Sequence, residues 1–397
     1  MDPAASSGPS PGIAEAEARL AVRQLDLSHF RNYHQLRLHC DGRMVVLTGA
    51  NGAGKTNLLE ALSFLTPGRG LRRARLSDVR PFDSKQPWAI AARLDTVHGE
   101  VRIGTGLSPE AGRERRVVRI DGEPAKGPLA LAEYVSCVWL TPAMDRLFMD
   151  GASARRRFLD RLVFTIDARH AERVARYEHG LRERARLLRD QPAGAGPWLA
   201  GLEQQAAELG IAVARARAAT LAGLNRVLGD MDSRFPHPRL SLRGKLEQAL
   251  ESQSDAEAVS ALVEAFAAAR PRDREIGGST VGPHRCDLVV HDVELDRPAA
   301  RCSTGRQKAL LVSIVLAETL LRAEGAGGRP ILLLDEVVAH LDEERRQGLF
   351  ALLRTLGAQA WLTGTDKSLF APLADAAEFF SVCDGMIARH DPTDPDG

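Results

Sequence analysis

Residues 49–56 read Gly-Ala-Asn-Gly-Ala-Gly-Lys-Thr, and this stretch decides the fold of the chain. It fits the pattern G-x-x-x-x-G-K-[ST] of a phosphate-binding loop, in which glycines let the backbone curl so that its amide groups face phosphate oxygens. The loop has the sequence context that it requires, because an apolar strand pattern at 45–47 precedes it and a helical pattern at 56–65 follows it. The sequence therefore predicts an α/β fold that binds ATP at the start of a helix.

Every position of this loop is a candidate nucleotide contact, and the eight residues are Gly49, Ala50, Asn51, Gly52, Ala53, Gly54, Lys55 and Thr56. Two of them have further roles. We expect the Lys55 ammonium to contact the β- and γ-phosphates and to assist catalysis, and the Thr56 hydroxyl to bind Mg²⁺. ATP and Mg²⁺ are therefore the expected cofactors.

A second motif supplies the acidic half of the same site. The run Ile331-Leu332-Leu333-Leu334 is a buried-strand pattern, and it ends in Asp335-Glu336. A strand of this kind delivers carboxylates to its carboxyl edge, where α/β sheets bind ligands. We expect Asp335 to hold Mg²⁺ and Glu336 to act as the general base on the attacking water. The alternative, in which the two acids only cap a helix, is weaker beside a phosphate-binding loop.

A third motif narrows the class of ATPase. Residues 302–307 read Cys-Ser-Thr-Gly-Arg-Gln before a long apolar helix, and they resemble the signature of ABC-type ATPases. Ser303 and Gly305 at a helix start make a second phosphate cradle, although Ser303 also fits a simple N-cap, and both roles are compatible. Asp342, which closes the segment 339–342, resembles the D-loop of the same class. The sequence thus predicts an ABC/SMC-like P-loop ATPase core.

In the ABC class the second cradle belongs to the opposite subunit. If both cradles are needed, neither chain holds a complete site, and two chains must meet head to tail across two ATP molecules. We therefore predict an ATP-dependent homodimer.

Three positions depart from the ABC pattern. Arg306 stands where the class has Gln, and residues 136–142 offer no coupling Gln. The His that follows the last core strand is also missing, and residues 363–366 read Thr-Gly-Thr-Asp there. We expect slow hydrolysis, with Asp366 as a candidate sensor of the γ-phosphate.

The order of patterns along the chain predicts a discontinuous core. We expect residues 1–18 to form a flexible N-terminal tail, residues 19–150 and 275–397 to form the ATPase core, and residues 151–274 to form an inserted α-helical lobe. Alternating segments at 88–96, 99–107 and 115–121 indicate an antiparallel β subdomain within the core.

Composition excludes some classes of protein. The 397-residue chain has a formal net charge of +1, so a DNA-binding surface must come from locally grouped arginines. The first 18 residues do not form a signal peptide, and the longest apolar run, at about 309–321, is broken by Glu318 and is too short to span a bilayer. We expect a cytoplasmic protein with no membrane partner.

Arginines gather in one segment. Residues 151–190 hold eleven arginines and six acidic residues. Grouped arginines suit phosphate contacts that are blind to sequence, although a solvated helix face with pairs such as Glu178–Arg182 is the alternative. The predicted DNA contacts are Arg155, Arg156, Arg157 and Arg161, with Arg72 and Arg73 in a second basic cluster.

Five segments outside the ATP motifs resemble the RecF family of bacterial recombination-repair proteins, and they lie at 30–33, 57–61, 66–74, 155–160 and 282–285. The resemblance extends from about residue 22 to 390. It implies a weak, DNA-dependent ATPase that dimerises on ATP and binds duplex DNA near single-strand gaps. It also implies partners, because RecF proteins work with RecR and RecO to help RecA replace single-strand-binding protein on single-stranded DNA. Cys286 stands where the family leads us to expect an acidic residue.

Three other functions remain open at this point. The nucleotide-binding subunit of a membrane transporter would share both phosphate cradles, but the missing coupling Gln and the arginine-rich lobe count against it. A scaffold that binds ATP without useful turnover is a second alternative, and another SMC-like repair ATPase is a third. The absence of long coiled-coil heptads disfavours the third.

Overall fold

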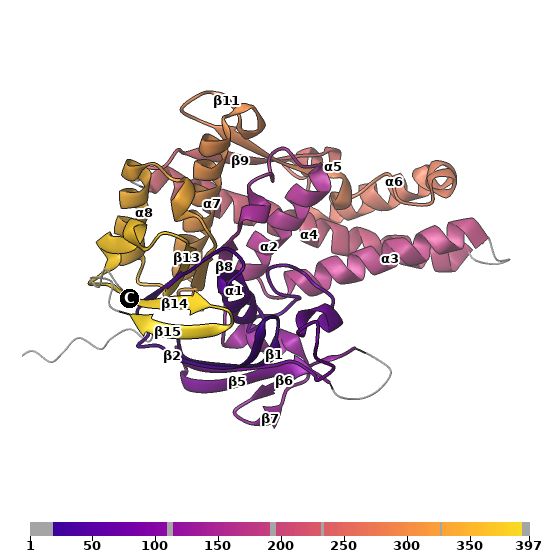
Figure 1. Cartoon of the computed structure of the whole chain (residues 1–397). Helices are drawn as coiled ribbons and strands as arrows, with labels where there is room; N and C mark the ends of the chain where they lie inside the picture. Colours follow the sequence, from indigo (N-terminus) through magenta and orange to yellow (C-terminus); the bar gives the residue numbers. More distant parts are fainter. Residues whose placement is uncertain (1–18, 109–113, 191–195, 232–233, 326–327, 391–397) are drawn as a thin grey trace, which may run out of the picture.

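The computed structural model describes residues 19–108, 114–190, 196–231, 234–325 and 328–390, and its amino-terminal part contains an antiparallel sheet (Figure 1). The strands of this sheet are β1 (Ala21–Phe30), β2 (Tyr33–His39), β4 (Ala89–Thr96), β5 (Gly99–Leu107), β6 (Arg116–Ile120) and β7 (Glu123–Pro124). Their order is β2-β1-β4-β5-β6-β7. Strands β4 to β6 confirm the meander predicted from alternating residues.

A second sheet forms the centre of the ATPase core. Its strands are β3 (Met44–Thr48), β8 (Cys137–Leu140), β12 (Ile331–Leu334), β13 (Ala360–Gly364), β14 (Ala377–Cys383) and β15 (Met386–His390). They lie in the order β15-β14-β3-β13-β12-β8, and every pair is parallel except β14 with β15. Both ends of the chain therefore contribute to one sheet, as the sequence predicts.

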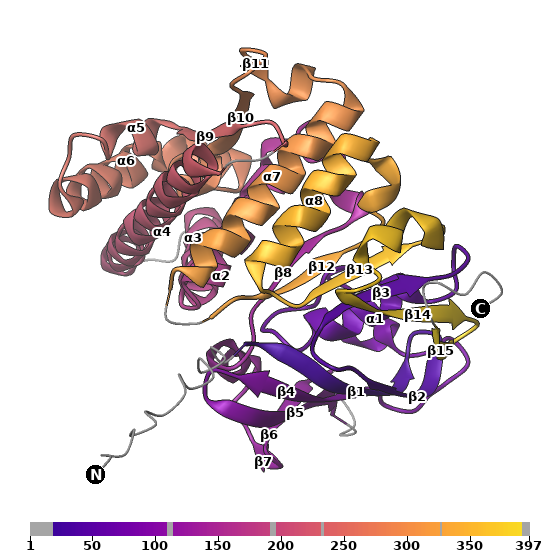
Figure 2. The ribbon, with the colours of Figure 1, turned by 90° about the vertical axis from the view of Figure 1, so that its left-hand side faces the viewer.

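Alternation along β12 separates two hydrophobic cores. Leu332 and Leu334 pack with α7 (Thr304–Ala323) and α8 (Glu343–Leu356) on one face of the central sheet. Ile331 and Leu333 pack on the other face with α1 (Lys55–Ser63) and the antiparallel sheet. This is the period of two that a strand buried on both faces requires. Figure 2 shows α7 and α8 on one side of the central sheet and α1 on the other.

The segment 151–274 extends from the core as an arm (Figure 2). Its helices are α2 (Ala152–Ile166), α3 (His170–Asp190), α4 (Gly196–Asp230), α5 (Lys245–Ala249) and α6 (Asp255–Ile276). The segment also contains a strand that the sequence did not predict, β9 (Pro238–Arg243), which pairs with β10 (Asp287–Asp292) and so joins the three-stranded sheet β11-β10-β9. Strand β11 is Arg297–Pro298.

The helix α4 belongs to two cores at once. Its first half, with Ala207 and Ile211, packs against α3 and α6 in the arm. Its second half, with Leu224 and Leu228, packs in the same core as α7 and the central sheet. The arm is therefore joined to the ATPase core by a continuous helix and by shared packing. In the described part of the chain, no helix combines the length and the apolar character that crossing a bilayer needs.

Candidate nucleotide site

The phosphate-binding loop lies between β3 and α1, and two of its glycines have no room for a side chain. Gly49 has a φ of 145°, and a Cβ there would lie 2.2 Å from the Val382 carbonyl oxygen. Gly54 has a φ of 119°, and a Cβ there would lie 2.5 Å from Nδ2 of Asn32. A side chain at either position would both strain the backbone and displace a neighbour. The loop conformation therefore depends on these two glycines.

Lys55 closes over the loop. Its Nζ donates hydrogen bonds to the carbonyl oxygens of Gly49 (2.7 Å) and Ala50 (2.8 Å), and the side chain is buried. Burial lowers the pKa of Lys55, while the carboxylates of Glu336 and Asp335 act in the opposite direction. The ammonium thus stands at the loop, where the β- and γ-phosphates of a nucleotide are expected.

The two predicted Mg²⁺ ligands meet in the structure. The Thr56 hydroxyl donates to Oδ1 (2.9 Å) and Oδ2 (3.0 Å) of Asp335, which follows β12. Burial raises the pKa of Asp335, and the hydrogen bonds from Thr363 and Thr56 partly oppose that rise. A hydroxyl and a carboxylate are the hard oxygen donors that Mg²⁺ prefers, and such sites leave its other positions to phosphates and water. The residues present therefore fit Mg²⁺.

Glu336 follows Asp335 in an unusual conformation. Its φ is 52°, and its N–H donates to Oγ1 of Thr363 at 2.9 Å. The same Thr363 oxygen donates to Oδ1 of Asp335 at 2.8 Å. Thr363 is the second-last residue of β13, which pairs with β12, and sequence reasoning missed it. The only signal was its place in the segment where the usual His is absent.

The residues of the second cradle lie away from this loop. Ser303 caps α7 and accepts a hydrogen bond from the Arg306 N–H at 3.4 Å, which confirms the capping role. Figure 2 shows α7 running from near β11, on the face of the central sheet opposite α1. Gly305 belongs to the first turn of α7. The structure therefore does not bring Ser303 and Gly305 to the phosphate loop of their own chain.

Asp342 and Asp366 both have local partners. Asp342 caps α8 by accepting from the Arg345 N–H at 2.9 Å. Asp366 accepts from the Ser368 N–H (2.8 Å) and hydroxyl (2.7 Å), and these bonds lower its pKa. Capping thus explains both carboxylates in this chain, and their nucleotide roles stay predictions.

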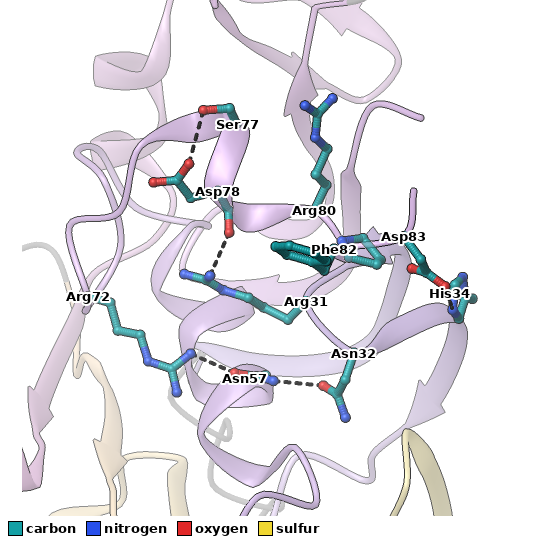
Figure 3. Close-up of a pocket in the computed structure, with 11 residues that line it drawn as sticks. Arg31, Asn32, His34, Asn57, Arg72, Ser77, Asp78, Arg80, Phe82 and Asp83 are labelled. Atoms are coloured by element: carbon teal, nitrogen blue, oxygen red, sulfur yellow. Dashed lines mark hydrogen bonds and ion pairs between the residues drawn. The ribbon is translucent and has the colours of Figure 1, made fainter. Parts of the chain in front are cut away.

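An open pocket of about 1100 Å³ adjoins the phosphate loop (Figure 3). It is lined by Arg31, Asn32, His34, Asn57, Arg72, Ser77, Asp78, Arg80, Pro81, Phe82 and Asp83. A chain of amides links it to the loop, because Asn57 donates to Asn32 Oδ1 (2.7 Å) and Asn32 donates to the Ala53 carbonyl (3.0 Å). The sequence did not identify this pocket, whose residues come from three separate segments.

Arg72, predicted to contact DNA, lies in this pocket. Its Nη1 donates to Asn57 Oδ1 at 2.6 Å and to Glu60 Oε2 at 2.8 Å. Glu60 is buried and also pairs with Arg31. Arg72 and Arg73 are both exposed, and the bonds to Asn57 and Glu60 anchor Arg72 beside the pocket.

Most of the predicted DNA contacts on α2 hold that helix in place. Arg155 makes two hydrogen bonds to Asp287, at 2.8 and 2.9 Å, and Arg156 donates to the Cys286 carbonyl at 2.7 Å. Arg157 is exposed and bonds only within α2, to Ser153, among the contacts described. DNA contact at these positions stays a prediction, and Arg157 is the best placed of them.

Arg161 is the furthest from its expected role. Its guanidinium lies 4.8 Å from the ring centre of Trp139 and 5.1 Å from that of Phe158. Burial lowers the pKa of Arg161 to about 10. An arginine held between two aromatic rings at the base of the arm is a packing residue in this conformation. The excess of arginine in the sequence thus reflects contacts between α2 and the core as well as surface charge.

Comparison with known proteins gives consistent results. The family RecF/RecN/SMC N terminal domain matches residues 21–387. A DNA replication and repair protein RecF from Rhizobium etli (strain CIAT 652) is 48% identical over 375 residues, which cover 93% of this chain and 99% of that protein. The RecF protein of Brucella suis biovar 1 (strain 1330) is 47% identical over 374 residues, with 93% and 96% covered.

Solved structures give the same fold. The structure of the recombination mediator protein RecF-ATPrS in the RecFOR pathway matches with a TM-score of 0.81 at 22% identity and covers 94% of this chain and 99% of its own. An Smc head domain from Pyrococcus furiosus, bound to the C-terminal domain of ScpA, matches with a TM-score of 0.53 at 16% identity, with 94% and 96% covered. The ABC/SMC-like core predicted from the signature is confirmed.

Proposed function

Because this chain belongs to the RecF family of the SMC-like ATPase superfamily, we propose that it is an ATP-dependent DNA-binding protein of recombinational repair and replication restart. The observation that carries the proposal is the meeting of Thr56 and Asp335 beside a phosphate-binding loop, with Glu336 next in the chain. These residues come from segments 279 positions apart and make one site. They supply the groups that ATP hydrolysis requires.

Each side chain has one task in the proposed reaction. Thr56 and Asp335 hold Mg²⁺, which when bound neutralises charge on the phosphates. Lys55 turns from the Gly49 and Ala50 carbonyls to the β- and γ-phosphates. Glu336 accepts a proton from the attacking water. Hydrolysis is slow, because residues 136–142 offer no coupling Gln and residues 363–366 lack the usual His.

The pocket in Figure 3 takes the base and ribose in this proposal. Its Asn57 is the residue after Thr56, so a nucleotide seated on the loop reaches it directly. Asn32 and Asn57 offer hydrogen bonds to the ribose or the base. Phe82 is fully exposed at the pocket and offers an aromatic face for stacking.

Two chains close over two ATP molecules. Ser303, Gly305 and Asp342 of one chain then contact the nucleotide on the loop of its partner. This arrangement accounts for the position of Ser303 and Gly305 away from their own loop. The closed homodimer binds duplex DNA at single-strand gaps, and DNA stimulates hydrolysis. Arg157 and Arg73 are exposed and contribute phosphate contacts.

The proposed partners follow from the family. A solved RecF–ATP structure is described as belonging to the RecFOR pathway. We propose that this chain works with RecO and RecR to load RecA onto gapped and single-stranded DNA in the cytoplasm.

Light scattering tests the shared site. With Mg-ATP and gapped duplex DNA, Glu336→Gln should double in mass, and the double variant Glu336→Gln/Ser303→Arg should stay monomeric. The Glu336→Gln/Ser254→Arg variant is a matched control, because Ser254 caps α6 in the arm as Ser303 caps α7. A Glu336→Gln chain that binds ATP but stays monomeric with and without DNA contradicts the shared-site mechanism.

A further inference from the structure

Thr363 links the two carboxylate residues of the site through one hydroxyl. The residue is the second-last of β13, its side chain is fully buried, and its Oγ1 has two partners. The Glu336 N–H can only donate, so Thr363 Oγ1 accepts that hydrogen bond (2.9 Å). The Thr363 hydroxyl proton is then free to donate to Asp335 Oδ1 (2.8 Å). Both bonds of this hydroxyl are therefore fixed in direction.

The backbone at Glu336 needs such a restraint. A φ of 52° lies in the left-handed region, which side chains other than glycine rarely adopt. Unfavourable conformations of this kind persist where surrounding contacts hold them, and they gather at functional sites. Two backbone hydrogen bonds restrain this place: the Glu336 N–H donates to Thr363 Oγ1, and the N–H of the preceding Asp335 donates to the Leu140 carbonyl at 2.9 Å.

The next residue cannot supply a side chain in this place. A Cβ added at Gly364 would lie 2.6 Å from Cε2 of Phe370, which is buried. A side chain at Gly364, the last residue of β13, would therefore require Phe370 to move. Among the described contacts, the side-chain hydrogen bonds from β13 to Asp335 and Glu336 come from Thr363.

We propose that Thr363 is a positioning residue for ATP hydrolysis. Its hydroxyl orients the Asp335 carboxylate by occupying Oδ1, and it holds the peptide of Glu336 so that the general base keeps a fixed direction. Glu336 touches the attacking water, whereas Thr363 acts through Glu336 and Asp335. This inference rests on the proposed ATPase function and deepens it.

Three variants separate positioning from packing. Thr363→Val keeps the shape and removes the hydroxyl, Thr363→Ser keeps the hydroxyl, and Thr319→Val is the matched control. Thr319 is also fully buried and donates to a carbonyl, that of Val315, within α7. The assays are Mg-ATP affinity, steady-state turnover with gapped DNA, and thermal melting.

We expect Thr363→Val to lower kcat by about 10- to 100-fold, since small displacements of a reacting group have effects of this size. The affinity for Mg-ATP should change by less than about 3-fold, and Thr363→Ser should recover most of the turnover. Thr319→Val should match the wild type in turnover. In the Glu336→Gln background Thr363→Val should have little further effect, because residues that act as a unit are not additive.

Several results would overturn the inference. One such result is a Thr363→Val variant with wild-type kcat. A second is a loss of ATP affinity that parallels the loss of kcat. A third is a Thr363→Val change that lowers the turnover of Glu336→Gln by the same factor as it lowers that of the wild type. If Thr363→Val does not fold, Thr363→Ala is measured against Thr319→Ala with the same expectations. A wild-type chain that hydrolyses no ATP contradicts the proposed function itself, whereas normal wild-type turnover with an unaffected Thr363→Val contradicts only the role of Thr363.

Discussion

The phosphate loop and the helix α2 carry equally conspicuous sequence patterns, yet the structure uses them differently. The loop residues meet partners that their motif predicts, as Thr56 meets Asp335. The arginines of α2 largely turn inward, where Arg155 pairs with Asp287 and Arg161 packs on Trp139. A motif whose spacing serves one chemistry therefore predicts geometry, whereas a local excess of charge does not distinguish a surface from an interface between elements. The predictions below test that difference.

The largest effect is expected at the general base. Glu336→Gln should lower ATP turnover by between about 10² and 10⁴-fold, the range for loss of general base catalysis, with ATP binding retained. Single-turnover hydrolysis beside an ATP-binding assay measures both. Unchanged turnover removes Glu336 as the base and leaves the loop without its catalytic partner.

Lys55→Ala comes next. The variant loses the only ammonium at the described phosphate loop, and we expect ATP affinity to fall by about 10²-fold or more, since a charge-assisted contact to phosphate is lost. Titration with a fluorescent ATP analogue measures it. ATP-dependent DNA binding should be lost together with ATP affinity. A Lys55→Ala variant with wild-type ATP affinity would contradict the assignment of the loop.

Arg155→Ala moves the test to α2. Removing the Arg155 side of its pair with Asp287 should cost about 2 kcal/mol of the free energy of unfolding, because charge-assisted hydrogen bonds are lost while Asp287 keeps its ion pair with Arg243. Arg157→Ala is the control for this measurement and should change it by less than about 0.5 kcal/mol, because its side chain is exposed. Denaturant unfolding measures the stability of both variants. If Arg155→Ala and Arg157→Ala are equally stable, Arg155 does not hold α2 to the core, and the surface role predicted from the sequence is favoured.

A smaller effect is expected at the pocket. Phe82→Ala should weaken ATP binding by about 5-fold through loss of stacking on the base, within the range for aromatic pairs. Binding of tripolyphosphate, which has no base, should not change, and Phe82→Trp should retain ATP affinity. Equal losses for ATP and tripolyphosphate would place the base elsewhere.

The smallest effect concerns DNA. Arg157→Ala should reduce the slope of log Kd against log salt by about 1, as loss of one phosphate contact predicts. Arg182→Ala is the comparison, since Arg182 is exposed further along the arm and lies near Glu178. An unaltered slope for Arg157→Ala would remove α2 from the DNA interface.

The sequence predicted most elements of the core, and the reason is local. The helix α7 was predicted directly after residues 302–303, because Ser303 caps it and a long apolar pattern follows. The strand β9 was missed, because its six residues show alternation too briefly after a long helical segment.

Contacts between distant segments account for what the sequence did not predict in the site. Thr363 reaches Asp335 only because β12 and β13 are neighbours, with Leu334 opposite Leu362. The pocket beside the loop likewise needs Arg31, Asn57 and Phe82 to come together from three segments. No periodicity in the sequence reports such a meeting.

The long helix α4 connects the ATPase core to the arm without a break. Its 35 residues span roughly 50 Å at 1.5 Å per residue, and its two halves are fixed in different cores. Near the ATPase end, Gly223 lies against Leu321 of α7, the helix that begins at the signature. A tilt of about 5° imposed there would carry the far end of the arm through roughly 4 Å, provided that the helix stays straight. Ångström-scale adjustments at the ATPase end of α4 would thus be magnified at the far end of the arm.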